Sequence, residues 1–214
     1  MQTPDTYRLW IEADQLLRQG NEAAAYAMLK ETAAFGNIGA MTKLAHLARS
    51  EKREAESHEW MDKAEKALRP GDIDGRKDLA DAYGQALGRG NYSDLKQRER
   101  ALLEEVAESG DISVQIELGQ HFSRDLVLLK DESLRSRAKE RRDYWINRAM
   151  DGGAYWAFFM HASVLFEEKK PVPPEVIKVL EELQSSQSLW VTDQKNLDVL
   201  LRAIARRANR KPKS

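Results

Sequence analysis

The stretch "AESGDISVQIELGQHF", residues 107–122, carries two glycines whose positions need different explanations. Gly110, followed by Asp111, has the form of a helix end and of the N-cap that begins the next helix. Gly119 lies nine residues further on, inside that next helix, where glycine costs about 1 kcal/mol relative to alanine. We expect a packing interaction to offset this cost, because a residue without a side chain lets a second helix approach closely.

Two earlier segments share this pattern, namely "FGNIGAMTKLA" (residues 35–45) and "PGDIDGRKDLA" (residues 70–80). In each, Asn or Asp follows a glycine directly, Ile stands two residues after the glycine, Leu eight residues after it and a small residue nine after it. The glycine is suited to the left-handed conformation at a helix end, and the leucine is expected to belong to a shared core. The pattern therefore predicts an internal repeat.

A fourth and looser copy is "DGGAYWAFFMHA", residues 151–162. If Gly152 is the turn residue, the large Met160 takes the leucine position. If Gly153 is the turn residue, Ala162 takes the position of the small residue. The residues alone leave both registers open.

Successive turn glycines are 35 to 42 residues apart, which is room for two helices and two turns. Turn glycine, Asn or Asp, Leu followed by Gly or Ala, and an aromatic residue twelve positions on (Tyr83 and Phe122) together resemble the Sel-one-like repeat, a relative of the tetratricopeptide repeat. The resemblance extends over residues 5–168. It implies an all-α fold, a right-handed α/α solenoid of about four to five helix-hairpin repeats with a C-terminal capping helix.

Helical periodicity runs along the chain, whereas alternating β-branched runs are absent. We expect residues 1–190 to form the repeat domain and residues 191–214 to form a capping helix with a basic tail. The final "NRKPKS" (209–214) is expected to be disordered. The expected helices are 5–19, 21–35, 38–50, 53–69, 73–88, 93–109, 112–123, 133–151, 154–168, 174–186 and 193–209.

Composition limits the classes of function. The 34 basic and 35 acidic side chains give a net charge of −1, which does not favour nucleic acid or a membrane as partner. The chain has no cysteine, which excludes disulfides, thiolate metal sites and a cysteine nucleophile. The start has no signal-peptide pattern and no apolar run is long enough to span a bilayer, so we expect a soluble cytoplasmic protein.

Catalytic motifs are absent from the sequence. It contains no Walker loop, GxGxxG or G-x-S-x-G motif, and its four histidines are not in an HExxH arrangement. Paired carboxylates such as Glu104 and Glu105 are adjacent in a helix and therefore point apart. We expect a non-enzymatic protein without cofactor or metal, and keep a hydrolase on a helical scaffold as a remote alternative.

The resemblance implies a function in binding a protein or peptide as an adaptor. It also implies that the first helix of each repeat lines a concave face. Residues beside the repeat leucine are then expected to face the partner. Trp156, in the aromatic stretch 154–162, is a possible anchor for that partner, although buried core is the favoured interpretation of this stretch. The candidate partner-binding residues are Thr42, Lys43, His46, Lys77, Asp78, Asp81, Glu117, Gln120 and Trp156.

An alternative site lies at the basic C-terminus, where residues 202–213 contain six basic side chains and no acidic one. These cations could contact nucleic acid or another acidic partner. We favour a simpler interpretation, in which they stabilise a helix C-terminus and solubilise the tail. The six are Arg202, Arg206, Arg207, Arg210, Lys211 and Lys213.

Overall fold

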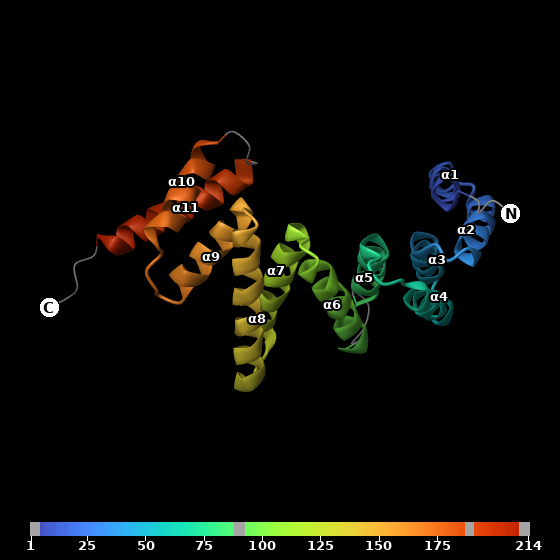
Figure 1. Cartoon of the computed structure of the whole chain (residues 1–214), viewed down its shortest axis with the longest axis horizontal. Coiled ribbons are helices and arrows are strands. Elements are labelled where there is room, and N and C mark those ends of the chain that lie inside the picture. Colours follow the sequence, from blue (N-terminus) through green and yellow to red (C-terminus); the bar gives the residue numbers. More distant parts are fainter. Residues whose placement is uncertain (1–4, 88–92, 187–190, 210–214) are drawn as a thin grey trace. The chain divides into compact units, whose positions relative to one another are not determined.

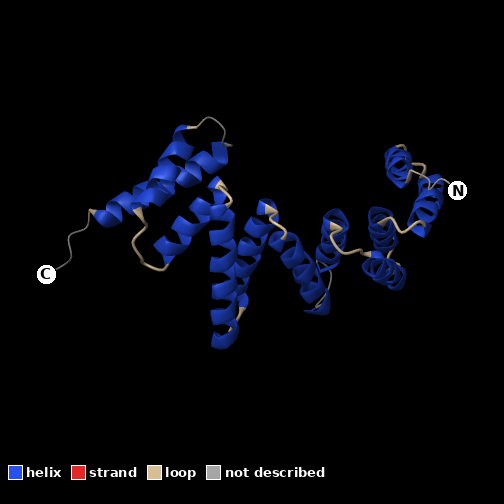
Figure 2. Cartoon of the chain, in the orientation of Figure 1, coloured by secondary structure: helices blue, strands red, loops and turns tan. Residues whose placement is uncertain are grey.

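The computed structural model describes residues 5–87, 93–186 and 191–209, and every regular element within them is a helix (Figures 1 and 2). The all-α prediction is confirmed, whereas the right-handed turn of the solenoid stays a prediction. The helices are α1 (Thr6–Arg18), α2 (Glu22–Ala34), α3 (Ile38–Ser50), α4 (Glu54–Ala67), α5 (Ile73–Leu87), α6 (Ser93–Glu108), α7 (Ile112–Leu128), α8 (Glu132–Asp151), α9 (Tyr155–Glu167), α10 (Pro174–Ser185) and α11 (Val191–Ala208).

The helix ends agree closely with those expected, with one exception at α7. We expected this helix to end at 123, but it continues to Leu128. Within the continuation Asp125 is 6% exposed, whereas Val127 and Leu128 are 84% and 72% exposed. Asp131 then begins α8 by accepting a hydrogen bond from the Leu134 amide at 2.9 Å, so the connection is short. The tail beyond 209 lies outside the described residues.

The turn glycines adopt the left-handed conformation that the repeat predicts. Gly36, Gly71, Gly110 and Gly153 have φ values of 83°, 80°, 104° and 81°. Gly152 has a φ of −74°, and this difference resolves the register of the fourth copy in favour of Gly153.

The residues after these turns cap and bury the next helix as expected. Asn37 and Asp111 accept hydrogen bonds from the backbone amides three residues on, at 2.8 and 3.1 Å. At the eighth position Leu44, Leu79 and Leu118 are all 0% exposed. The leucines therefore lie in the core that neighbouring helices share.

Gly119 of α7 provides the close approach that its position suggested. A Cβ atom built on it would lie 3.0 Å from Ile146 Cγ1 of α8 and 3.3 Å from Met160 Cε of α9. Both distances are shorter than ordinary van der Waals contact. The cost of glycine in the helix is thus offset by packing among three helices.

The chain divides into two compact units, Met1–Val106 and Ala107–Ser214. In the first unit α1 packs against α2, and α3 packs against α4. Helix α3 also contacts α2 and α5, so it occupies the middle of this unit. The first helices of the three hairpins, α1, α3 and α5, consequently lie in succession.

A polar link recurs between the second helices of successive hairpins, and in one of the three links the tyrosine, Tyr83, lies on a first helix, α5. In each link the Nη1 atom of an arginine donates to a tyrosine hydroxyl and to a glutamate carboxylate. The three links lie between α2 and α4, between α4 and α6, and between the end of α6 and α8. Burial raises the pKa of Tyr83 to about 12, so this hydroxyl stays protonated and donates to Glu65 at 3.0 Å. The links are Tyr26–Arg53–Glu56, Tyr83–Arg98–Glu65 and Tyr144–Arg148–Glu108.

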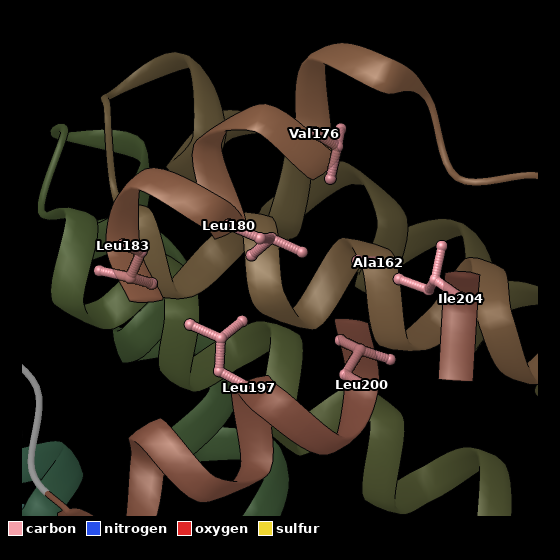
Figure 3. Close-up of a cluster of buried hydrophobic side chains, with 7 residues drawn as sticks. All are labelled: Ala162, Val176, Leu180, Leu183, Leu197, Leu200 and Ile204. Atoms are coloured by element: carbon pink, nitrogen blue, oxygen red, sulfur yellow. The ribbon is translucent and has the colours of Figure 1, made fainter. Parts of the chain in front are cut away.

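The second unit has its own core, where α11 contacts both α9 and α10. Figure 3 shows apolar side chains of the three helices turned toward one another. This packing is what a capping helix requires, although the expected boundary at 190/191 stays a prediction. The buried side chains of the cluster are Ala162, Val176, Leu180, Leu183, Leu197, Leu200 and Ile204.

Glu168, at the end of α9, ties this helix to α8. Its carboxylate lies 2.7 Å from Lys170 Nζ, 3.0 Å from Lys139 Nζ and 3.0 Å from Nη2 of Arg142. Hydrogen bonds from Lys170, Lys139 and Arg142 lower the pKa of Glu168 to about 2. Because the Arg142 side chain is only 7% exposed, the carboxylate also neutralises a nearly buried cation.

Substituting Gly119→Leu is expected to destabilise the fold by about 1–3 kcal/mol, because the new side chain overlaps Ile146 and Met160. Urea denaturation followed by circular dichroism measures the change. Arg124→Leu, at an exposed position of the same helix, is the control and should change the free energy of unfolding by less than about 0.5 kcal/mol. Equal stability of the Gly119 variant and the wild type would contradict the repeat register.

Substituting Glu168→Gln is expected to lower the free energy of unfolding at pH 7 by about 1–2 kcal/mol. The pKa of Glu168 is lower in the folded chain than in the unfolded chain, so its contribution is complete above pH 4.5 and is lost as the pH falls toward 2. Denaturation at several pH values should show the two stabilities converging in that window. Exposed Glu167→Gln serves as control, and a difference that persists at pH 2 would refute the assignment.

Candidate functional site

A groove runs along the first helices of the first unit and contains most of the predicted site. Its larger part has a volume of about 690 Å³ and lies between α1, the start of α3 and α5. A second part of about 350 Å³ continues along α3 and α5. The two parts share Trp10, Gly39, Asp78 and Asp81, so we treat them as one α1–α3–α5 groove.

Helical spacing places the side chains of this groove. Tyr7 and Trp10 are three residues apart on α1, and their rings stack with centroids 6.3 Å apart. Asp74, Asp78 and Asp81 follow one another at helical spacing along one face of α5 and line the groove. The groove thus carries aromatic rings from α1 and carboxylates from α5.

Gly39 of α3 lies between these two groups and keeps the groove open. A Cβ atom at this position would lie 3.0 Å from Asp78 Oδ2 and 3.4 Å from Trp10 Nε1. Any larger residue would therefore displace the carboxylate or the indole. The absence of a side chain here lets both polar atoms reach the same point of the groove.

Four carboxylates and two cations, Arg69 and Lys77, line this part of the groove, so its charge is net negative. Partial burial, and then the charges of Asp81, Asp74 and Asp72, raise the pKa of Asp78. Within the part of the chain that the structure describes, Asp74, Asp78 and Asp81 form no ion pair. A cation from a partner would relieve this repulsion.

In the other part of the groove, the polar side chains have partners within the chain. Lys43 Nζ lies 3.2 Å from the Asp14 carboxylate. The Nδ1 atom of His46 lies 2.9 Å from Gln85 Oε1 and 3.2 Å from Nη2 of Arg49, which is 6% exposed. The polar groups at this end of the groove are therefore held in place by one another.

Six of the nine predicted residues line the α1–α3–α5 groove: Thr42, Lys43, His46, Lys77, Asp78 and Asp81. The other three lie in the second unit. Glu117 approaches His121 at 3.6 Å, and Gln120 is exposed on the same helix. Trp156 is half-buried and stacks on Phe159 at 4.7 Å, and Phe159 packs against the core of that unit. That packing agrees with the favoured interpretation of the aromatic stretch as core.

Sequence reasoning missed the aromatic side of the groove. Tyr7 and Trp10 precede the first turn glycine of the aligned repeats, so no repeat position assigned them to a face. A helical projection of 5–19 would have placed both on one face of the helix. Asp72 was expected only as an N-cap. It is one, because its carboxylate accepts a hydrogen bond from the Gly75 amide at 2.9 Å, but it also lines the groove.

The basic C-terminal residues that the structure describes include two with structural contacts. Arg202 pairs with Asp198 at 2.5 Å. The Arg207 guanidinium lies 3.9 Å from the centroid of the Phe166 ring and donates to the Phe166 carbonyl at 2.7 Å. The Arg202 pair lies within α11, whereas the Arg207 contacts join α11 to α9. Arg210, Lys211 and Lys213 lie outside the described residues.

Over the residues with described positions, no three His, Asp or Glu side chains gather as a metal site would require. No helix in the same residues is both long and apolar enough to cross a membrane.

Comparison of the chain with family models, with curated proteins and with solved structures gives no match.

Replacing Asp78 by Asn is expected to stabilise the protein at pH 7 by about 0.5 kcal/mol, or about 1 °C in Tm. The pKa of Asp78 is higher in the folded chain than in the unfolded chain, so ionised Asp78 destabilises the folded state. This destabilisation is present at pH 7 and disappears when the pH falls below the pKa of Asp78 in the unfolded chain. Thermal melting should show the gain at pH 7 and none at pH 3. Exposed Glu59→Gln on α4 is the control, and a gain that is independent of pH would contradict this explanation.

Proposed function

We propose that the chain is a non-enzymatic adaptor that binds an extended segment of a partner protein in the α1–α3–α5 groove. The observation that carries this proposal is that six residues, chosen from repeat position and from the face that the resemblance implies, line one groove that also holds two aromatic rings. Stacked hairpins typically expose such a surface for binding extended partners. The resemblance to Sel-one-like repeats supports the same class of function.

The chemistry of the groove favours a partner segment with a basic side chain. An ammonium or guanidinium group is attracted by the face of an indole or phenol ring and by carboxylates. Trp10, Asp78 and Asp81 provide these groups, and the first two reach over Gly39, where a Cβ atom would lie 3.4 Å from Trp10 Nε1 and 3.0 Å from Asp78 Oδ2. A lysine or arginine seated there would neutralise carboxylates that repel one another.

The remaining groove residues support binding more than catalysis. The Thr42 hydroxyl donates to the Gly39 carbonyl at 3.0 Å, so it is engaged within its own helix. The His46 ring nitrogen is occupied by Gln85 and Arg49. The two side chains therefore lack the hydroxyl-to-imidazole bond that an activated nucleophile requires.

Selection of a random 12-residue peptide library on the immobilised chain tests the proposal. We expect enrichment of peptides with Lys or Arg, whose affinity falls about tenfold or more in the double variant Asp78→Asn/Asp81→Asn. Fluorescence anisotropy with synthetic copies of the selected peptides measures the affinity.

Glu59→Gln is the control variant for this experiment, because this exposed carboxylate lies on α4, away from the groove. Trp10→Ala should weaken binding as well, with circular dichroism to verify the fold. Enrichment without basic residues, or affinities unchanged in the double variant, would reject the groove as the binding site.

A further inference from the structure

A second groove in the first unit lies on α2 and α4. It has a volume of about 470 Å³. Its floor is apolar and is formed by Ala33 and Ala34 of α2, Met41 of α3 and Ala67 of α4. The half-buried indole of Trp60 forms one wall. Small side chains at the floor and a large ring at the wall leave an apolar depression.

Three lysines surround this depression, and none of the described residues that line it is acidic. Lys30, Lys63 and Lys66 make no ion pair within the described part of the chain. The Nζ atom of Lys63 lies 4.1 Å from the centre of the Trp60 ring. The α2–α4 groove therefore combines an apolar floor with three cations that are not neutralised by neighbours.

We propose that the α2–α4 groove is a second docking surface, for an acidic protein segment that carries a bulky apolar side chain. The apolar side chain would occupy the depression over Met41 and against Trp60, where it loses contact with water. Glu or Asp residues on either side of it would meet the ammonium groups of Lys30, Lys63 and Lys66. The proposal is independent of the function assigned to the α1–α3–α5 groove.

The shape of the surface favours a peptide over a lipid membrane. Binding to a membrane surface depends on apolar side chains that project into the bilayer, surrounded by cations. Here the apolar atoms form the floor of a depression, and Ala33 and Met41 are 3% and 7% exposed. A hollow floor can receive a side chain but has little to insert into lipid.

The two grooves of the first unit differ in the sign of their unpaired charges. The α1–α3–α5 groove carries carboxylates without ion pairs, whereas the α2–α4 groove carries lysines without ion pairs. A partner segment whose charge suits the unpaired groups of one groove does not suit those of the other. Together with the function proposed for the α1–α3–α5 groove, this difference would let one unit hold a basic and an acidic segment at the same time.

The test uses the full chain and a fluorescein-labelled 12-residue peptide of Glu, Ala and Gln with one central Phe. Two matched peptides replace the Phe by Ala, or every Glu by Lys. We expect the Phe-to-Ala change to weaken binding about tenfold, and the double variant Lys63→Glu/Lys66→Glu to weaken binding of the original peptide by at least as much. Anisotropy measures affinity, and NMR shift changes on α2 and α4 locate the site.

A control double variant, Lys130→Glu/Lys195→Glu, changes net charge equally at exposed positions of the second unit. It should bind the acidic peptide as the wild type does. Ala34→Met fills the exposed edge of the floor without changing charge, and should abolish the preference for Phe over Ala.

Three results would overturn the proposal. The first is equal affinity for the Phe and Ala peptides. The second is equal weakening by the two double variants, which would indicate attraction to overall charge. The third is binding to vesicles with about 30% phosphatidylserine that depends on Lys63 and Lys66, without binding of the peptide, which would indicate a membrane surface.

Discussion

Close contact between helices through small residues is the constraint on which the rest of the structure depends. One helical hairpin cannot bury its own apolar face, so each must be covered by the next. The leucine after each turn supplies the buried surface, and the small residue beside it determines how near the neighbour comes. Gly119 is the extreme case, because it touches two other helices without any side chain of its own.

This packing also explains where the candidate binding surfaces lie. Stacking through α3 brings α1 and α5 to the two sides of one helix, so residues far apart in the chain form one groove. Because Gly39 has no side chain, the Trp10 indole and the Asp78 carboxylate can both reach over it into that groove. On α2 and α4 the same stacking leaves a depression that is floored by alanines and rimmed by lysines.

The helices were predictable because they follow from local pattern, whereas the expectation that first helices line a binding face came from the family resemblance. Turn glycines mark the helix ends, and the offset from each glycine determines which side of the helix is buried. The predicted α7 was too short. Asp125, a charged residue that the sequence suggests is exposed, is 6% exposed in the folded chain and lies within the helix. Trp10 and the α2–α4 groove depend on contacts between hairpins, which no repeat position in the sequence encodes.

The Tyr–Arg–Glu links show how such a chain can change in length. Each of the three links joins the second helices of two adjacent hairpins, and Tyr83 of α5 also takes part in one of them. A duplicated hairpin would bring its own leucine, small residue and polar link, and would meet matching partners on both sides. Lengthening by whole hairpins would therefore preserve the junctions, whereas insertion of a single helix would break two of them.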